Sequence, residues 1–251
     1  MKFVEKPFVP DKKVKLALVD PRMPHEMKCF LNDRGIETID GFNSKMTYEA
    51  ISGHPDISFC HVGGSKAVAS PESFEYYKKE LSRHGFEVVR GQKSPGIKYP
   101  GNICYNAAII GSLVIHKLSH TDTVLLDELE CNGIKKINVK QGYSKCSICI
   151  VGENAIITAD SNIHEVALQN GVGSLLIRAG GVVLDGFEYG FIGGSSGLIS
   201  ENEIFFAGDI ANHPNYASIM EFLHKNGKDA VCMNGRELLD VGSIIPLKEW
   251  M

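Results

Sequence analysis

The sequence lacks several features that would place it in a common functional class. Its 26 lysines and arginines are outnumbered by 30 aspartates and glutamates, so the net charge is −4, and no long block of one sign occurs. Nucleic-acid binding needs a basic stripe that neutralises phosphates, so we expect no nucleic-acid partner. No apolar run reaches the roughly 18 residues of a membrane-spanning helix, so we expect no membrane association. The N-terminal stretch also lacks the apolar segment of a signal peptide.

Cofactor and metal signatures are missing as well. No G-x-G-x-x-G follows an expected strand, and no Lys-Ser or Lys-Thr follows the glycine-rich stretch "FIGGSSGL" at the spacing of a phosphate-binding loop. Cys146 and Cys149 form a single C-x-x-C on an expected strand, where their side chains point to opposite faces. Structural zinc needs convergent thiolates. We therefore expect no metal and no cofactor.

Cysteine use indicates a cellular compartment. The seven cysteines are an odd number, scattered from Cys29 to Cys232. This distribution fits free thiols better than a disulfide framework. The sequence thus predicts a cytoplasmic protein.

The chain carries an internal repeat. Five times a helical pattern ends in glycine and a short β-rich run follows, at "NDRGIETI", "SRHGFEVV", "ECNGIKKI", "QNGVGSLLI" and "HKNGKDAV". Glycine is the usual left-handed residue just past a helix. Four of the helices follow a strand-turn-strand pattern, with opening strands evenly spaced near residues 59, 103, 147 and 191. One step earlier, near residue 15, the first unit runs almost directly from strand to helix and lacks a second strand.

The repeat predicts an architecture. The expected ββαβ modules lie near residues 14–40, 57–90, 101–140, 145–178 and 190–233. Such a unit cannot bury its apolar face alone, so neighbours must close around one another. We predict one α/β domain over residues 1–251: a five-module ββαβ propeller with pseudo-fivefold symmetry around a central channel, its helices outside. The alternative is an open doubly wound α/β sheet.

Five ββαβ modules over about residues 14 to 247 resemble the pentein, or guanidino-group-modifying, superfamily. Its members include arginine deiminases, dimethylarginine hydrolases, agmatine deiminases and amidinotransferases, and a ribosome anti-association factor shares the fold without catalysis. The resemblance implies a hydrolase or transferase acting on a guanidino, amidino or ureido small molecule in the channel. A small polar substrate is the expected partner, and a homodimer is left open.

Catalytic penteins resemble one another in a nucleophilic cysteine near the end of the chain, on a glycine-rich segment. The matching stretch here, "LLDVGSIIPL", contains Ser243 and no cysteine. A serine needs an activating base, which the sequence does not identify. The alternative function is therefore a non-catalytic pentein-fold protein that binds a small molecule or a macromolecule, and enzymatic activity stays open.

Strand alternation selects candidate channel residues. Even-numbered positions of the expected opening strands are richer in small polar groups than odd-numbered ones, and we predict that they line the channel. Cys60, Cys104 or Cys146 could then supply a displaced nucleophile, at most one of them. Cys60 and His61 are adjacent on one strand and point to opposite faces, so they do not form a dyad.

Six further residues are candidates for substrate binding. They are Asp20, Arg22, Asn102, Asn106, Ser196 and Ser243. A carboxylate pairs with a guanidinium through bidentate, charge-assisted hydrogen bonds, so Asp20 fits the implied substrate, although Asp20 and Arg22 could equally form a structural ion pair. The buried amides and the small serines could contact a ligand or hold modules together. "HTD" at His120–Asp122 echoes a deiminase motif, but a helix N-cap explains it more simply.

Overall fold

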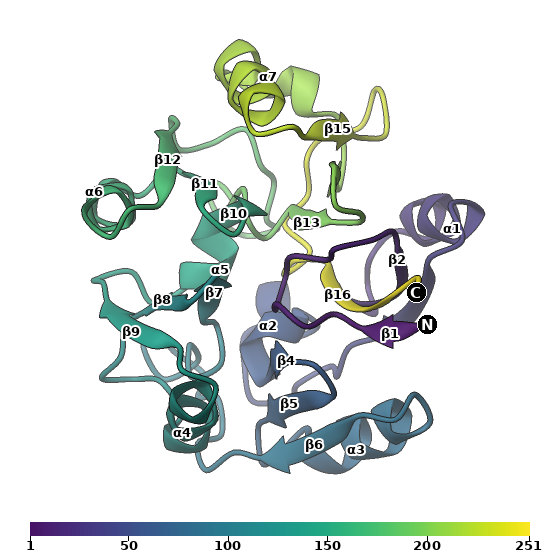
Figure 1. Cartoon of the computed structure of the whole chain (residues 1–251), viewed down its shortest axis with the longest axis vertical. Helices are drawn as coiled ribbons and strands as arrows, with labels where there is room; N and C mark the ends of the chain where they lie inside the picture. The colour runs from purple at the N-terminus through teal and green to yellow at the C-terminus, as the bar shows by residue number, and fades with distance from the viewer.

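The computed structural model describes residues 1–251 as an α/β fold of five small sheets (Figure 1). Four of the sheets have three strands each, and their strand order follows the chain. In each of these four, the first two strands are antiparallel and the third is parallel to the second. The predicted order strand, strand, helix, strand is therefore found four times, and five sheets fit five modules.

The four regular modules have closely matched elements. The second contains β4 (Phe59–Gly63), β5 (Lys66–Ala69), α3 (Phe74–Ser82) and β6 (Glu87–Arg90). The third contains β7 (Ala108–Ile110), β8 (Leu113–His116), α4 (Thr123–Cys131) and β9 (Lys135–Asn138). The fourth contains β10 (Ile148–Gly152), β11 (Ala155–Thr158), α6 (Ser161–Gln169) and β12 (Gly173–Leu176). The fifth contains β13 (Ser196–Leu198), β14 (Glu203–Phe206), α7 (Tyr216–Lys225) and β15 (Asp229–Val231).

The first module borrows a strand from the other end of the chain. Its elements are β1 (Lys2–Phe3), β2 (Val14–Val19), α1 (His25–Asp33), β3 (Glu37–Asp40) and β16 (Ile245–Glu249). The strand order is β1-β16-β2-β3, and Figure 1 shows both termini at this sheet. Since β2 is antiparallel to β16 and parallel to β3, β2 is a middle strand. The sequence interpretation that this module lacks its second strand was wrong, because the opening strand is the one supplied from elsewhere.

Short segments precede the opening strands. Two of them are single helical turns, α2 (Pro55–Ser58) before β4 and α5 (Ser144–Ser147) before β10. Proline at the first turn of α2 suits a helix start, because its missing N–H is not needed there. The second module was expected to begin near residue 57 with its opening strand, but Ile57 and Ser58 belong to α2. Two 3-10 turns, η1 (Glu49–Ile51) and η2 (Ile210–Asn212), complete the elements.

Each long helix buries one narrow stripe. In all five, the fully buried residues are a pair four positions apart, which lie on the same helix face. The pairs are Met27 and Leu31, Tyr77 and Leu81, Leu125 and Leu129, Ile163 and Ala167, and Ile219 and Leu223. Most of them join one large apolar cluster with the strands, while the α1 pair joins a smaller one. None of the helices combines the length and the apolar composition needed to cross a membrane.

Candidate functional site

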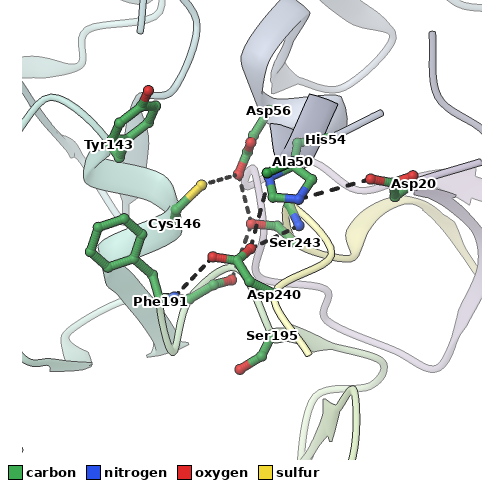
Figure 2. Close-up of polar contacts among 12 residues, drawn as sticks. Asp20, Ala50, His54, Asp56, Tyr143, Cys146, Phe191, Ser195, Asp240 and Ser243 are labelled. Atoms are coloured by element: carbon green, nitrogen blue, oxygen red, sulfur yellow. Dashed lines mark hydrogen bonds and ion pairs between the residues drawn. The ribbon is translucent and has the colours of Figure 1, made fainter. Parts of the chain in front are cut away.

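A cluster of buried polar side chains forms where the segments before the opening strands meet (Figure 2). Three of these segments supply its charged and nucleophilic groups. They contribute His54 just before α2 and Asp56 within it, Lys145 and Cys146 in α5, and Asp240 and Ser243 before β16. All six residues are at most 8% exposed. The repeat thus brings residues far apart in sequence to one place, which we call the central cluster.

Asp56 is the acceptor at the middle of this cluster. Its Oδ2 accepts hydrogen bonds from Ser243 Oγ at 2.9 Å and from Cys146 Sγ at 3.1 Å, while its Oδ1 has no partner. Burial raises the pKa of the Asp56 carboxyl, because the charged form is removed from water. The Asp56 carboxyl therefore holds a proton more readily than an exposed aspartate does.

Lys145 lies on the other side of Ser243. It is 2% exposed, and its Nζ donates to Ser243 Oγ at 2.9 Å and to Gly193 O at 3.2 Å. Burial lowers the pKa of the Lys145 amine. Ser243 therefore bridges a buried base and a buried acid. The sequence interpretation missed Lys145, although a lysine that opens the apolar run "KCSICIV" was a usable signal.

Cys146 is the predicted thiol that enters the cluster. Besides its bond to Asp56, its Sγ accepts a hydrogen bond from Asn106 Nδ2 at 3.1 Å. Asn106 Oδ1 in turn accepts from the backbone N–H of Lys145 at 2.8 Å, so this predicted amide positions α5. Burial, followed by the nearby Asp56 and Asp240 carboxylates, raises the pKa of the Cys146 thiol well above its ordinary value. The resting thiol is therefore protonated.

His54 lies between two carboxylates. Its Nε2 is 3.9 Å from Asp20 Oδ2, and its Nδ1 is 3.8 Å from Asp240 Oδ1. Both separations exceed hydrogen-bond length, and Nδ1 has no partner although it is buried. A His54 nitrogen, Cys146 Sγ and an Asp240 oxygen all lie within 4.8 Å of one another. Gly242 (φ +65°) allows this approach, because a Cβ there would lie 2.2 Å from the Cβ of His54.

A cavity of about 790 Å³ reaches the central cluster at Asp240 and is also lined by Asp20. Its wall carries four carboxylates and one guanidinium, together with aromatic rings. The charged lining residues are Asp20, Arg22, Glu49, Asp185 and Asp240. The rings of Tyr48 and Phe187 also line it, with centroids 5.3 Å apart. The cavity is net acidic, which favours a cationic ligand.

The predicted pair Asp20 and Arg22 forms as an ion pair. Arg22 Nη2 lies 2.6 Å from Asp20 Oδ2 and Arg22 Nε lies 3.0 Å from Asp20 Oδ1. The guanidinium also donates to the backbone carbonyls of Glu49 and Ala50. These bonds hold Arg22 against the cavity wall and fix Asp20 beside His54.

Two predicted cysteines stay outside the cluster. Cys60 is buried in the apolar core, where burial raises the pKa of its thiol to about 12. The Sγ of Cys104 lies 3.4 Å from Gly101 O. Cys60 lies on β4 itself, whereas the cluster is built by the segments before the strands. Cys104 does lie in such a segment, before β7, but it contacts Gly101 instead of the cluster. His61 is buried with its Nε2 2.9 Å from Gly64 O, away from any dyad with Cys60.

The remaining predicted residues have structural partners. Asn102 Oδ1 accepts from Tyr143 OH at 2.9 Å, and Tyr143 OH lies 2.9 Å from Tyr48 OH at the cavity wall. Ser196 Oγ donates to Ile192 O at 2.8 Å. Asp122 caps α4 by accepting from the N–H groups of Val124 and Leu125, as predicted for "HTD".

Comparison with known families decides the classification. A family model described as "Family of unknown function (DUF6873)" matches residues 18–245. The chain belongs to this family. No curated protein matches it.

Solved structures resemble the chain over nearly its whole length. Inosamine-phosphate amidinotransferase from Streptomyces griseus aligns with a TM-score of 0.62 at 8% identity, over 100% of this chain and 97% of that one. DDAH from Pseudomonas aeruginosa, a cysteine-to-serine variant complexed with citrulline, gives 0.57 at 9% identity, over 89% and 92%. Agmatine deiminase from C. jejuni gives 0.51 at 11% identity, over 95% and 94%. All three are penteins, so the predicted resemblance in fold is confirmed.

Proposed function

We propose that this protein binds a small guanidino or amidino cation in the acidic cavity and that Cys146 attacks the central carbon of that cation. The supporting observation is that the acidic cavity and the central cluster share Asp240. Asp240 lines the cavity, and it lies together with a His54 nitrogen and Cys146 Sγ within 4.8 Å. The solved relatives named above include an amidinotransferase and a deiminase, and their fold supports the same substrate class.

Charge and size fit such a ligand. The volume of about 790 Å³ lies within the usual range of small-molecule sites. A planar cation can place its N–H groups on the carboxylates of Asp20 and Asp240, and the rings of Tyr48 and Phe187 can cover its faces. A ureido compound has the same shape without the charge, so we expect it to bind more weakly.

The proposed reaction uses groups already in contact. The thiol proton of Cys146 passes to Asp56 Oδ2, 3.1 Å away. The sulfur then forms a bond to the amidino carbon, a C–N bond of the substrate breaks, and the departing amine takes a proton from His54. Asp20 and Asp240 stabilise the protonated imidazole from both sides. A water molecule then gives a proton to His54 and attacks the carbon of the resulting thiouronium. The C–S bond breaks, the sulfur takes back its proton from Asp56, and the product leaves, which completes a hydrolysis. A second amine that attacks the same carbon in place of water, with the same C–S cleavage, completes an amidino transfer.

We also propose that the five sheets close into a ring with the central cluster in its channel. The fold shared with the penteins supports this arrangement, as does β16, which connects the last segment of the chain to the first module. Closure would bring all five segments before the opening strands to one axis.

A second function has its own support. The pKa of the Cys146 thiol is raised well above its ordinary value, and the position expected for a cysteine holds Ser243. Both observations favour a protein that binds the same cation without turning it over. This alternative retains the cavity and its carboxylates and needs no thiolate.

Two labels of nearly the same shape, one cationic and one neutral, separate these functions. Chloroacetamidine is a cation with an alkylating carbon, and chloroacetamide is its neutral counterpart. We expect chloroacetamidine to alkylate Cys146 more than tenfold faster than chloroacetamide, and arginine or agmatine to slow the reaction, as read by peptide mass mapping. Asp240→Asn should remove most of this preference, whereas Cys149→Ser should leave it unchanged.

Turnover is measured in parallel, as release of ammonia or amine from a panel of guanidino compounds. Turnover that Cys146→Ala abolishes supports the enzyme. Calorimetric binding of a guanidino compound, without turnover and without the Cys146 adduct, supports the binding protein. No binding, no adduct and no turnover would overturn both.

A further inference from the structure

We propose that the central cluster binds one divalent transition-metal ion, best Zn²⁺, through His54, Cys146 and Asp240, and that this ion and the cationic ligand exclude each other. The exclusion rests on the proposed function, whereas the metal site does not. The three ligands come from three segments of the chain. Cysteine spacing in the sequence does not reveal this site, because only one of the three ligands is a cysteine.

The donor atoms are close to the geometry that zinc requires. The nitrogen, sulfur and oxygen donors all lie within 4.8 Å of one another. Around one tetrahedral zinc ion with bonds of about 2.0 to 2.3 Å, neighbouring donors lie about 3.5 Å apart. Side-chain rotations that move the donor atoms by about 1 Å would close the site. The side chains of His54 and Asp240 are each 1% exposed, so the ion would be shielded from bulk water.

An unpartnered atom points to a missing ligand. His54 Nδ1 is buried, has no hydrogen-bond partner and faces Asp240 Oδ1 at 3.8 Å. Buried polar atoms are nearly always satisfied, so a lone imidazole nitrogen beside a carboxylate and a thiol needs an explanation. Coordination through Nδ1 supplies one.

The second nitrogen of His54 is also placed as in metal sites. Metal-bound histidines usually direct their other N–H at a carboxylate, which fixes the ring and strengthens the ligand. His54 Nε2 lies 3.9 Å from Asp20 Oδ2, and Arg22 fixes that carboxylate in turn. The row Arg22, Asp20, His54 thus resembles the outer support of a metal centre.

Charge and donor type select the metal. One thiolate, one imidazole and one carboxylate suit Zn²⁺ and Co²⁺, whereas Mg²⁺ and Ca²⁺ prefer oxygen donors alone. The thiolate and the carboxylate together balance a divalent ion, and the Cys146 thiol already donates a hydrogen bond to Asp56 Oδ2, which can take up the proton that binding would displace. Because Asp240 also lines the cavity, a bound ion would occupy a carboxylate that the cationic ligand needs and would repel that ligand.

Cobalt provides a direct probe of the site. The full chain is freed of metal with a chelator and titrated with Co²⁺, and we expect one equivalent to give a thiolate-to-cobalt absorption band. Zn²⁺ should bleach this band, and competition with a chromophoric chelator should count one Zn²⁺ per chain. Cys146→Ala should abolish the band, whereas Cys149→Ala, three residues along in the apolar core, should keep it. No band, or a band that survives Cys146→Ala, would overturn the metal site.

Two more measurements complete the test. Asp20→Asn leaves all three ligands in place and should weaken Zn²⁺ binding by about tenfold through the loss of its support to His54; unchanged affinity would overturn that role. Zn²⁺ should also block the chloroacetamidine adduct at Cys146. If Zn²⁺ binds and the adduct still forms, mutual exclusion is overturned while the metal site stands. If no adduct forms even without Zn²⁺, the proposed function fails and the metal titration is unaffected.

Discussion

The short helices α2 and α5 occupy matching places in modules two and four, yet they bring opposite charges to the centre. Each has four residues, ends in serine and leads into a five-residue strand whose pairing shifts at the same point. α2 carries the acid Asp56, whereas α5 carries the base Lys145. The repeated backbone sets the position of a side chain at the centre, and the identity of the residue there sets its charge.

The two helices depend on each other through a third segment. Ser243 Oγ donates to Asp56 and accepts from Lys145, so the acid of one module and the base of another share one hydroxyl. Ser243 has a left-handed backbone (φ +78°), which is unusual for a residue other than glycine. This linkage implies that neither helix tolerates loss of the other's charge.

The largest expected effect comes from removing one partner of this pair. Asp56→Asn or Lys145→Met should each lower the free energy of unfolding by about 3–5 kcal/mol, because an uncompensated charge stays buried. The double variant should lose clearly less than the sum. Urea unfolding of the four proteins at neutral pH measures the coupling.

An exposed ion pair provides the control for this comparison of single and double variants. Lys6 and Glu153 form an exposed ion pair, and Glu153→Gln should change stability by less than about 1 kcal/mol. Strictly additive losses at Asp56 and Lys145 would mean that the two helices do not share charge.

The next effect concerns a strand position at which the modules differ. His61 on β4 corresponds to Ile150 on β10, since they pair with Ala67 and Ile156 at matching register. Burial lowers the pKa of folded His61 to about 4 from its ordinary 6.5. The unfolded chain therefore takes up a proton that the folded chain does not as pH falls below about 6.5. The free energy of unfolding therefore does not depend on this histidine above that pH. It declines by about 3 kcal/mol per such histidine by about pH 4.

His61→Ile copies module four into module two and should flatten this decline. Between about pH 7 and about pH 4, the variant should lose about 3 kcal/mol less than the parent. Urea unfolding across that range measures the difference. His116, whose pKa burial also lowers to about 4, remains in both proteins. An equal slope in the two proteins would show that His61 is not responsible.

Thiol reactivity gives a smaller contrast. Cys60 and Cys149 occupy matching strand positions, and burial raises the pKa of their thiols to about 12 and about 11. Iodoacetamide near pH 8 should label exposed Cys131 more than tenfold faster than either, because the thiolate is the reactive form. Peptide mass mapping of the native protein measures the rates. Rapid labelling of Cys60 would mean that module two opens more readily than module four.

The smallest effect is at a helix start. Asp160 caps α6 by accepting from the N–H of Ile163 at 2.8 Å, whereas Ser73 at the start of α3 makes no such cap bond. Asp160→Ala should lower the free energy of unfolding by about 1 kcal/mol, measured by urea denaturation. A loss below about 0.3 kcal/mol would mean that α6, like α3, is held by packing alone.

The order of the repeated elements was readable from sequence because strand-turn-strand patterns and helix-ending glycines are local. The even spacing of the opening strands was wrong in two modules, since β7 begins at Ala108 and β13 at Ser196 rather than near residues 103 and 191. The first module was misread because its opening strand, β16, lies at the far end of the chain and leaves no local trace beside β2. Strand alternation failed at the site for a similar reason. α2 and α5 interrupt the alternation just where the residues of the central cluster stand.

The candidate site was therefore found in part. Cys146, Ser243 and Asp20 were singled out from their residue types and places, whereas His54 was not proposed as a site residue. Lys145 and Asp240 were not considered at all. Their roles depend on contacts between segments of different modules, which no spacing within one module reveals.

The placement of β16 between β1 and β2 has a consequence for synthesis on the ribosome. Leu18 pairs with Ile245, so the sheet of the first module stays incomplete until the other four modules have emerged. Until then β2 has one unpaired, apolar edge, of the kind that invites contact with other chains. A nascent chain stalled before residue 245 should thus bind chaperones. Once β16 has been synthesised and pairs with β2, the exposed edge is covered and the chain should dissociate from them.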